Sequence, residues 1–178
     1  MTTLNATARL LDAIHFAAQR HRDQRRKDRE ASPYINHPLA LARLLAVDVG
    51  IDDQDVLIAA ILHDTVEDTE TTLDELRERF GDTVARIVAE VTDDKALPKH
   101  RRKALQVEHA PRKSPSAALV KLADKICNLR DIANSPPADW SLQRRRDYFD
   151  WAKQVIDGLP PVSAPLMALF EQAYALRP

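Results

Sequence analysis

One acidic segment of the sequence has the residue types of a metal site. The segment His63-Asp64-Thr65-Val66-Glu67-Asp68 follows directly on an apolar run, residues 56–62, that predicts a buried helix. Carboxylates at the C-terminal end of a helix face the negative end of its dipole, and like charges three or four residues apart cost about 0.2–0.5 kcal/mol per pair. A bound cation would remove this penalty. The alternative, that Asp68 or Thr69 belongs to the solvated first turn of the next helix, is about equally compatible with this segment taken alone.

A further carboxylate, Asp124, lies at the border of an apolar helix face. Over residues 119–129 the apolar side chains cover about half of the helix circumference, which predicts a central helix. Asp124 and Asn128, four residues apart, fall just outside this arc. A carboxylate at such a border either pairs with a cationic side chain or acts as a ligand. Because Lys121 and Lys125 are close in sequence, a salt bridge is the stronger interpretation of Asp124 taken alone.

Histidine supplies the remaining ligand type. His37 stands in a short link, residues 33–38, where proline restricts the backbone before a helix. It completes a set of two imidazoles and two carboxylates: His37, His63, Asp64 and Asp124. Such donors suit Mn²⁺, Fe²⁺ or Zn²⁺ and leave positions open for water and substrate. A metal there could make a water nucleophilic near neutral pH, and Glu67 and Asp68 could orient that water or protonate a leaving oxygen.

Positive charge is segregated from these acids, in residues 20–29 and 95–113. The chain has only 3 glycines, so it cannot build a glycine-rich phosphate loop. Any phosphate must therefore be held by side chains or by a metal. For any single basic residue, a solvated helix face or an RNA contact is the better interpretation. The acidic strip and the two basic segments together indicate hydrolysis of a highly phosphorylated small molecule.

Helices must position these residues, because no segment alternates as a strand would. Periodicity and turn residues predict helices near residues 10–18, 38–50, 53–62, 72–81, 84–91, 99–109, 117–134, 140–157 and 163–176. We therefore expect an all-α helical bundle forming a single domain over residues 1–178. Asp53 and Thr72 are the expected N-caps of two of these helices, and Gly81 is an expected helix stop.

Composition restricts the class of protein further. The 178 residues are 44% hydrophobic and 30% charged with a net charge of −1, which is typical of a globular protein and argues against a nucleic-acid partner. The single cysteine cannot form an internal disulfide. No apolar run approaches the roughly 20 residues that cross a bilayer, and no secretory signal is visible. We expect a cytoplasmic protein without a membrane partner.

Several motifs resemble a known family. The order His37, His63-Asp64, Asp124 is similar to the H…HD…D pattern of HD-domain metal-dependent phosphohydrolases. Finer motifs resemble the hydrolase domain of the RelA/SpoT alarmone enzymes, and most closely the small alarmone hydrolases that are stand-alone metazoan homologues of SpoT. These motifs are Arg25-Arg26-Lys27-Asp28, Pro33-Tyr34-Ile35-Asn36-His37-Pro38, residues 62–69, Phe80-Gly81, Val91-Thr92-Asp93-Asp94-Lys95, residues 105–108, Lys121-Leu122-Ala123-Asp124-Lys125, residues 128–131 and residues 148–152. The resemblance covers nearly the whole chain.

The resemblance implies a specific reaction. It implies an HD fold with one Mn²⁺, or alternatively Zn²⁺ or Fe²⁺, held by His37, His63, Asp64 and Asp124. The implied reaction removes the 3′-pyrophosphate of (p)ppGpp to give GDP or GTP, with Glu67 and Asp68 as the catalytic acidic pair. The implied substrate contacts are Arg26, Lys27, Lys95, Lys99, Arg102, Asn128 and Tyr148.

Two alternatives remain open beside the alarmone hydrolase. The same resemblance admits removal of the 2′-phosphate of NADPH, or action on another nucleotide, because both reactions cleave a phosphate ester on a secondary ribose hydroxyl. A non-catalytic nucleotide-binding sensor is the alternative from another class. Two departures from the family pattern are visible: Ala31 stands where relatives often have glycine, and Cys127 where tyrosine is frequent.

Overall fold

The computed structural model describes residues 5–178, and over this range the chain is α-helical with no strand. The α-helices are α1 (Ala6–Arg20), α2 (Asn36–Arg43), α3 (Gln54–Leu62), α4 (Thr65–Asp68), α5 (Leu73–Phe80), α6 (Asp82–Val91), α7 (Lys99–His109), α8 (Pro115–Asn134), α9 (Leu142–Asp157) and α10 (Ala164–Tyr174). A π-helical turn, η1 (Leu44–Asp48), extends α2, and a short 3₁₀ turn, η2 (Ala110–Arg112), follows α7. The predicted all-α class is confirmed.

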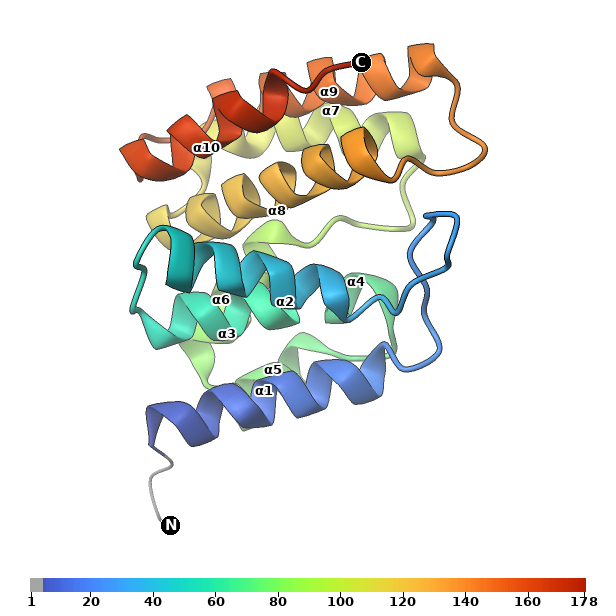
Figure 1. The fold of residues 1–178 in the computed structure, drawn as a ribbon. Helices are drawn as coiled ribbons and strands as arrows, with labels where there is room; N and C mark the ends of the chain where they lie inside the picture. The colour runs from blue at the N-terminus through green and yellow to red at the C-terminus, as the bar shows by residue number, and fades with distance from the viewer. Residues whose placement is uncertain (1–4) are drawn as a thin grey trace.

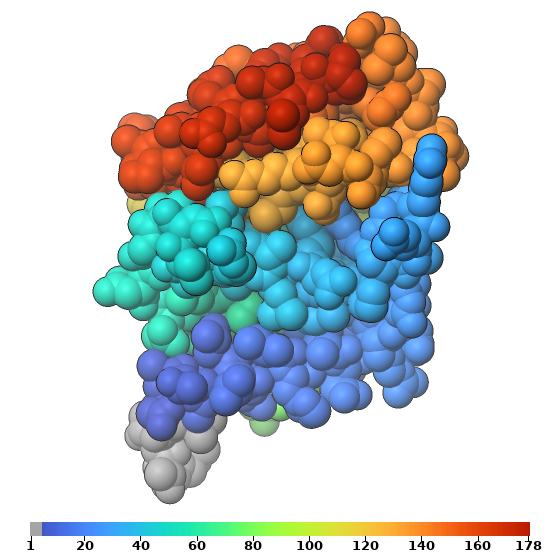
Figure 2. Space-filling view, viewed as in Figure 1, coloured from blue at the N-terminus to red at the C-terminus, as the bar shows by residue number. Residues whose placement is uncertain are grey.

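The helices stack in layers along the molecule, with α1 at one end and α9 and α10 at the other (Figure 1). Helix α8 lies between the two groups, because it contacts α2, α3 and α6 on one side and α9 and α10 on the other. Figure 2 shows that the segment after α1 extends along the edge of the molecule towards the layer of α8 and α9. A central α8 is what the wide apolar face of residues 119–129 predicts.

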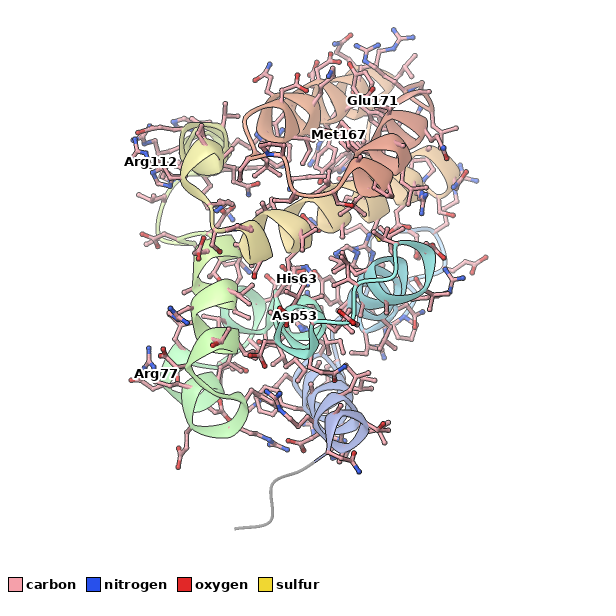
Figure 3. All side chains as sticks on the ribbon, turned by 90° about the vertical axis from the view of Figure 1, so that its left-hand side faces the viewer. Asp53, His63, Arg77, Arg112, Met167 and Glu171 are labelled. Carbon is pink, nitrogen blue, oxygen red and sulfur yellow. The ribbon has the colours of Figure 1, made fainter. Side chains whose placement is uncertain are left out.

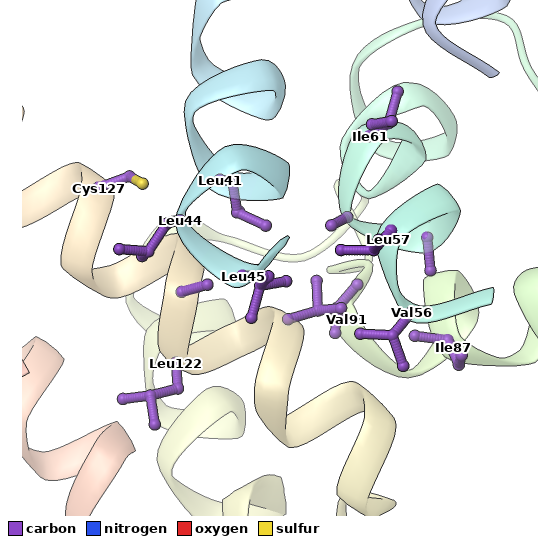
Figure 4. Close-up of a cluster of buried hydrophobic side chains, with 14 of the residues drawn as sticks. Leu41, Leu44, Leu45, Val56, Leu57, Ile61, Ile87, Val91, Leu122 and Cys127 are labelled. Atoms are coloured by element: carbon purple, nitrogen blue, oxygen red, sulfur yellow. The ribbon is translucent and has the colours of Figure 1, made fainter. Parts of the chain in front are cut away.

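The core joins apolar side chains from four helices. One core cluster includes Leu45 from η1, Leu57 from α3, Val91 from α6 and Leu122 from α8, all labelled in Figure 4. All of the apolar residues of α3 from position 56 to 62 are at most 5% exposed. Each large aliphatic side chain buried in this way contributes about 1.5–3 kcal/mol. This packing fixes the end of α3, where the acidic segment begins.

Local chemistry sets several helix ends as expected. The Asp53 carboxylate accepts hydrogen bonds from the backbone amides of residues 55 and 56, and the Thr72 hydroxyl accepts one from the Glu75 amide. Gly81 has a φ of 99°, a conformation that favours glycine, and α5 ends there. Ala31 also has a positive φ, of 49°, in the loop before Pro33. A glycine at this position would adopt this angle without steric cost.

Helix α2 differs from the prediction, whereas the end of α3 agrees with it. Helix α2 begins at Asn36 rather than at Pro38 and changes to the wider π-helical turn η1 before Gly50. Helix α3 ends at Leu62, as predicted, and the Thr65 hydroxyl donates to the Leu62 carbonyl at 2.7 Å. Within residues 5–178 no helix has the length and apolar character needed to cross a membrane.

Candidate active site

Three helical elements bring the predicted metal ligands to one point. His37 lies in the first turn of α2, His63 and Asp64 form the break after α3, and Asp124 lies near the middle of α8. Figure 3 places His63 in the interior of the molecule, near α8. The ligand atoms of His37, His63 and Asp124 all lie within 4.8 Å of one another, although 87 residues separate the first from the last.

Asp64 adjoins this cluster. Its Oδ2 lies 2.9 Å from His63 Nε2 and 4.0 Å from His37 Nε2, while Asp124 Oδ1 lies 3.2 Å from His37 Nε2. The hydroxyl of Tyr34 donates a hydrogen bond to the same Oδ2 of Asp64. The structure therefore gathers all four residues expected as ligands, and their role as ligands remains a prediction.

The surroundings of His63 fit a metal-binding imidazole. Its Nδ1 lies 2.8 Å from the Ala60 carbonyl oxygen, so Nδ1 carries a proton, and Nε2 is the ring nitrogen that faces the cluster. This Nε2 is buried, and the nearby Asp64 oxygen is not aligned to accept a hydrogen bond from it. Metal-binding histidines characteristically donate their other N–H to a carbonyl in this way. The nitrogen and carboxylate donors together fit a divalent metal ion.

The charges of the cluster depend strongly on one another. Burial alone would lower the pKa of His63, but the neighbouring Asp64 carboxylate raises it to about 9. Burial alone would raise the pKa of Asp124, yet the adjacent Lys125 ammonium and His37 hold it well below its usual range. The carboxylates thus require positive charge nearby, and the Lys125 ammonium and the His63 imidazolium supply it. A divalent cation would displace the proton of His63.

The salt bridge expected for Asp124 is present, and its role as a ligand stays a prediction. Lys125 Nζ lies 3.1 Å from Asp124 Oδ2, so the expected salt bridge forms, while Lys121 instead donates to the Val91 carbonyl at 3.0 Å. Asp124 also faces His37, and Asn128 Nδ2 donates to its Oδ1 at 2.6 Å. Asp124 is only 8% exposed, because α2, α3 and α9 cover α8 on several sides. Asn128 is therefore positioned to orient Asp124 as well as to meet a substrate.

The acidic pair lies in the short helix α4 beside the cluster. Glu67 Oε2 accepts a hydrogen bond from the Asp93 amide at 3.0 Å, and its Oε1 lies 3.5 Å from the guanidinium of Arg102. Burial raises the pKa of the Glu67 carboxyl. Asp68 accepts hydrogen bonds from Gln24 at 2.8 Å and from Lys95. A half-buried glutamic acid that holds its proton more tightly beside a second carboxylate is suited to proton transfer.

The predicted substrate contacts are divided between two neighbouring cavities. A cavity of about 610 Å³ is lined by His37, Asp68 and the predicted contacts Arg26, Lys27, Asn128 and Tyr148. A second cavity, of about 300 Å³, is lined by Lys99, Arg102 and again Tyr148, with Lys103 and Arg144 beside them. Trp140 and Tyr148 line both. Lys95 lines neither cavity and pairs instead with Asp68. Both basic segments thus adjoin the acidic centre, the first through the cavity that His37 lines and the second through Lys95 and Arg102.

Several residues of the site received no role from the sequence. Tyr34 holds Asp64, Gln24 holds Asp68, and Asp131 pairs with Arg26. His21 is 2% exposed and contacts Gln24. Tyr34 and Asp131 stand inside motifs of the family resemblance, which was a usable signal. No local pattern points to Gln24 or His21, since Gln24 meets Asp68 44 residues away.

The fold and the site define a class of protein. The sequence matches the family described as HD domain over residues 13–148, and the chain belongs to this family. The resemblance that the motifs predicted is confirmed.

Individual members of the family extend the comparison. The chain is 55% identical over 170 residues to the human guanosine-3′,5′-bis(diphosphate) 3′-pyrophosphohydrolase MESH1, which covers 96% of this chain and 95% of the relative. It is 53% identical over 173 residues to the protein of the same name from Danio rerio, covering 97% and 96%. The solved structure of a metazoan ortholog of SpoT that hydrolyzes ppGpp superimposes with a TM-score of 0.93, at 42% identity, over 99% of this chain and 98% of the other.

Proposed function

We propose that this chain is a metal-dependent hydrolase that removes the 3′-pyrophosphate of (p)ppGpp, leaving GDP or GTP and pyrophosphate. The observation that carries the proposal is the meeting of His37, His63, Asp64 and Asp124 at one buried point beside a basic cavity. The substrates named for the human and Danio rerio relatives are of this chemistry. A small, highly phosphorylated nucleotide suits both the cavity and its cations.

We assign the metal as Mn²⁺, held by those four residues. When bound, the ion would act as a Lewis acid and lower the pKa of a coordinated water. Tyr34 and Asn128 orient Asp64 and Asp124, respectively, and Lys125 offsets the charge of Asp124. These outer contacts keep the four donors in place for the ion.

The chain itself supplies proton transfer and phosphate binding. Glu67, whose pKa is raised by burial, is suited to protonate the ribose 3′-oxygen as its bond to phosphorus breaks. Asp68, which receives hydrogen bonds from Gln24 and Lys95, is suited to orient and deprotonate the attacking water. Arg26 and Lys27 in one cavity, and Lys99 and Arg102 in the other, would hold the phosphates.

A second substrate is supported by the shape of the site. The cavity of about 300 Å³ adjoins the first and shares Trp140 and Tyr148 with it, which extends the space available to a ligand. A dinucleotide such as NADPH needs a longer site than a mononucleotide does. Its 2′-phosphate is, like the 3′-pyrophosphate, esterified to a secondary ribose hydroxyl.

The test incubates the purified protein with ppGpp and Mn²⁺ and resolves the products by anion exchange. We expect GDP and pyrophosphate, with loss of activity in His63→Ala and no change in His100→Ala, a matched control because His100 is exposed and lines neither cavity. A parallel incubation with NADPH that releases inorganic phosphate, without turnover of ppGpp, would move the assignment to the second substrate. Tight nucleotide binding without turnover of either would identify a sensor and refute both.

A further inference from the structure

Asp68 is a side chain with open space on two sides. It lines the cavity of about 610 Å³ that contains His37, and it also lines a separate open cavity of about 900 Å³ on the side of α1. Its side chain is 20% exposed. Because apolar packing does not enclose this carboxylate, its orientation depends on its hydrogen bonds.

Only one of its two hydrogen-bonding partners is fixed by the fold. Lys95 reaches Asp68 Oδ1 from the loop between α6 and α7, and the Lys95 side chain is 49% exposed. Gln24 Nε2 donates to Asp68 Oδ2 at 2.8 Å from a half-buried position. The backbone of Gln24 is itself held in place, since its amide donates to the His21 carbonyl at 3.0 Å and its carbonyl accepts from the Tyr34 amide at 3.1 Å.

His21 determines which end of the Gln24 amide faces Asp68. Its Nδ1 lies 2.6 Å from Gln24 Oε1, and its ring packs on Tyr34 with the ring centres 4.9 Å apart. Nε2 of His21 is buried and has no partner among residues 5–178. The neutral ring therefore carries its proton on Nδ1 and donates it to Oε1. With Oε1 engaged in this way, the amide NH₂ of Gln24 must point to the carboxylate.

We propose that Gln24, oriented by His21, is a positioning residue that holds the Asp68 carboxylate towards the reacting centre. The identity of the reaction rests on the proposed function, whereas the positioning of Asp68 rests on the contacts described above. Neither residue belongs to the expected set of ligands or substrate contacts. Together, His21 and Gln24 connect the end of α1 to Asp68 in α4. The ring of His21 also packs on Tyr34, whose hydroxyl donates to Asp64.

The kinetic test is a double-mutant cycle between Gln24 and Asp68 with ppGpp and Mn²⁺. Gln24→Leu keeps the approximate size of the side chain but removes the donor, and we expect kcat to fall about 10- to 100-fold with KM within about twofold. In an Asp68→Asn background the same substitution should change kcat by less than about twofold, since Gln24 acts only through Asp68. Gln19→Leu, an exposed glutamine of α1, is the matched control and should retain the wild-type kcat.

Substitutions at His21 separate positioning from mere packing. His21→Asn keeps an N–H donor near the place of Nδ1 and should retain most of the activity, whereas His21→Leu fills the space without a donor and should resemble Gln24→Leu. Equal losses in both variants, or a Gln24→Leu effect that is undiminished in the Asp68→Asn background, would overturn the proposal.

A structural measurement keeps the proposal testable if ppGpp is not the substrate. Crystal structures of the wild type and of Gln24→Leu would show the position of the Asp68 carboxylate without any turnover. We expect the carboxylate to rotate away from its wild-type position, towards Lys95. An unmoved carboxylate would refute the positioning role, while absence of ppGpp hydrolysis by the wild type would refute only the proposed function.

Discussion

Lys121 offers a sharp test of the electrostatics beneath the site. This lysine of α8 is 6% exposed, and its ammonium donates to the carbonyl of Val91, the last residue of α6. The next turn of chain carries Asp93, whose amide holds Glu67. Burial, followed by repulsion from Lys125, lowers the pKa of Lys121 to about 8. The perturbation is Lys121→Met, which keeps the length of the side chain and removes the titrating group.

The magnitude follows from the two pKa values. In the unfolded chain the ammonium titrates near its ordinary value of 10.5, and in the folded protein near 8. Between these values the unfolded chain binds more protons than the folded one, so the free energy of unfolding rises with pH. At about 1.4 kcal/mol per pKa unit the full effect is about 3 kcal/mol, of which about 2.5 kcal/mol falls between pH 7 and pH 10.

The assay is denaturant unfolding of the metal-free protein at several pH values from 7 to 10. We expect the free energy of unfolding of the wild type to rise relative to that of Lys121→Met by about 2.5 kcal/mol across this range. Lys27→Met, which removes an exposed ammonium, is the control and should follow the wild-type curve. Parallel curves for the wild type and Lys121→Met would refute the assignment of a burial penalty to this lysine.

Three further predictions concern the ligands and the loop beside them. Asp124→Asn should abolish high-affinity Mn²⁺ binding in a calorimetric titration; unchanged affinity would exclude this residue as a ligand. Tyr34→Phe removes the donor to Asp64, so Mn²⁺ affinity should fall about 10- to 100-fold in the same titration, and an unaltered value would contradict the orienting role. Ala31→Gly relieves a positive φ that costs about 1–2 kcal/mol, but it also increases the conformational entropy of the unfolded chain. We therefore expect the free energy of unfolding, measured by thermal denaturation, to rise by at most about 1 kcal/mol. A decrease would contradict strain at Ala31.

Helix ends and the order of motifs were predictable because they depend on neighbours in the sequence. Asp53 and Thr72 cap helices through amides only two or three residues away. Gly81 ends α5 because its φ of 99° is accessible to glycine without a side-chain clash. The break after α3 was less predictable, since it requires the Thr65 hydroxyl to bond to the Leu62 carbonyl in preference to a further helical turn.

The candidate site was predictable as a set of residues but not as an arrangement. The two imidazoles and two carboxylates could be singled out by residue type. Their order along the chain then indicated the family that they resemble. Whether Lys121 or Lys125 pairs with Asp124 depends on the rotation of α8 against its neighbours. In the structure Lys125 forms this pair, and Lys121 donates to the Val91 carbonyl instead. The burial of Asp124, which its position at the edge of an apolar arc did not predict, has the same origin.

What the sequence determined by itself is therefore the helical class, the helix ends and the inventory of chemical groups, all of which follow from interactions within a few residues. The tertiary structure decided which of these groups meet. His37 and Asp124 are 87 residues apart, and Gln24 and Asp68 are 44 residues apart. No local preference encodes such contacts, because they arise only when α1, α2, α3 and α8 bury their apolar faces against one another.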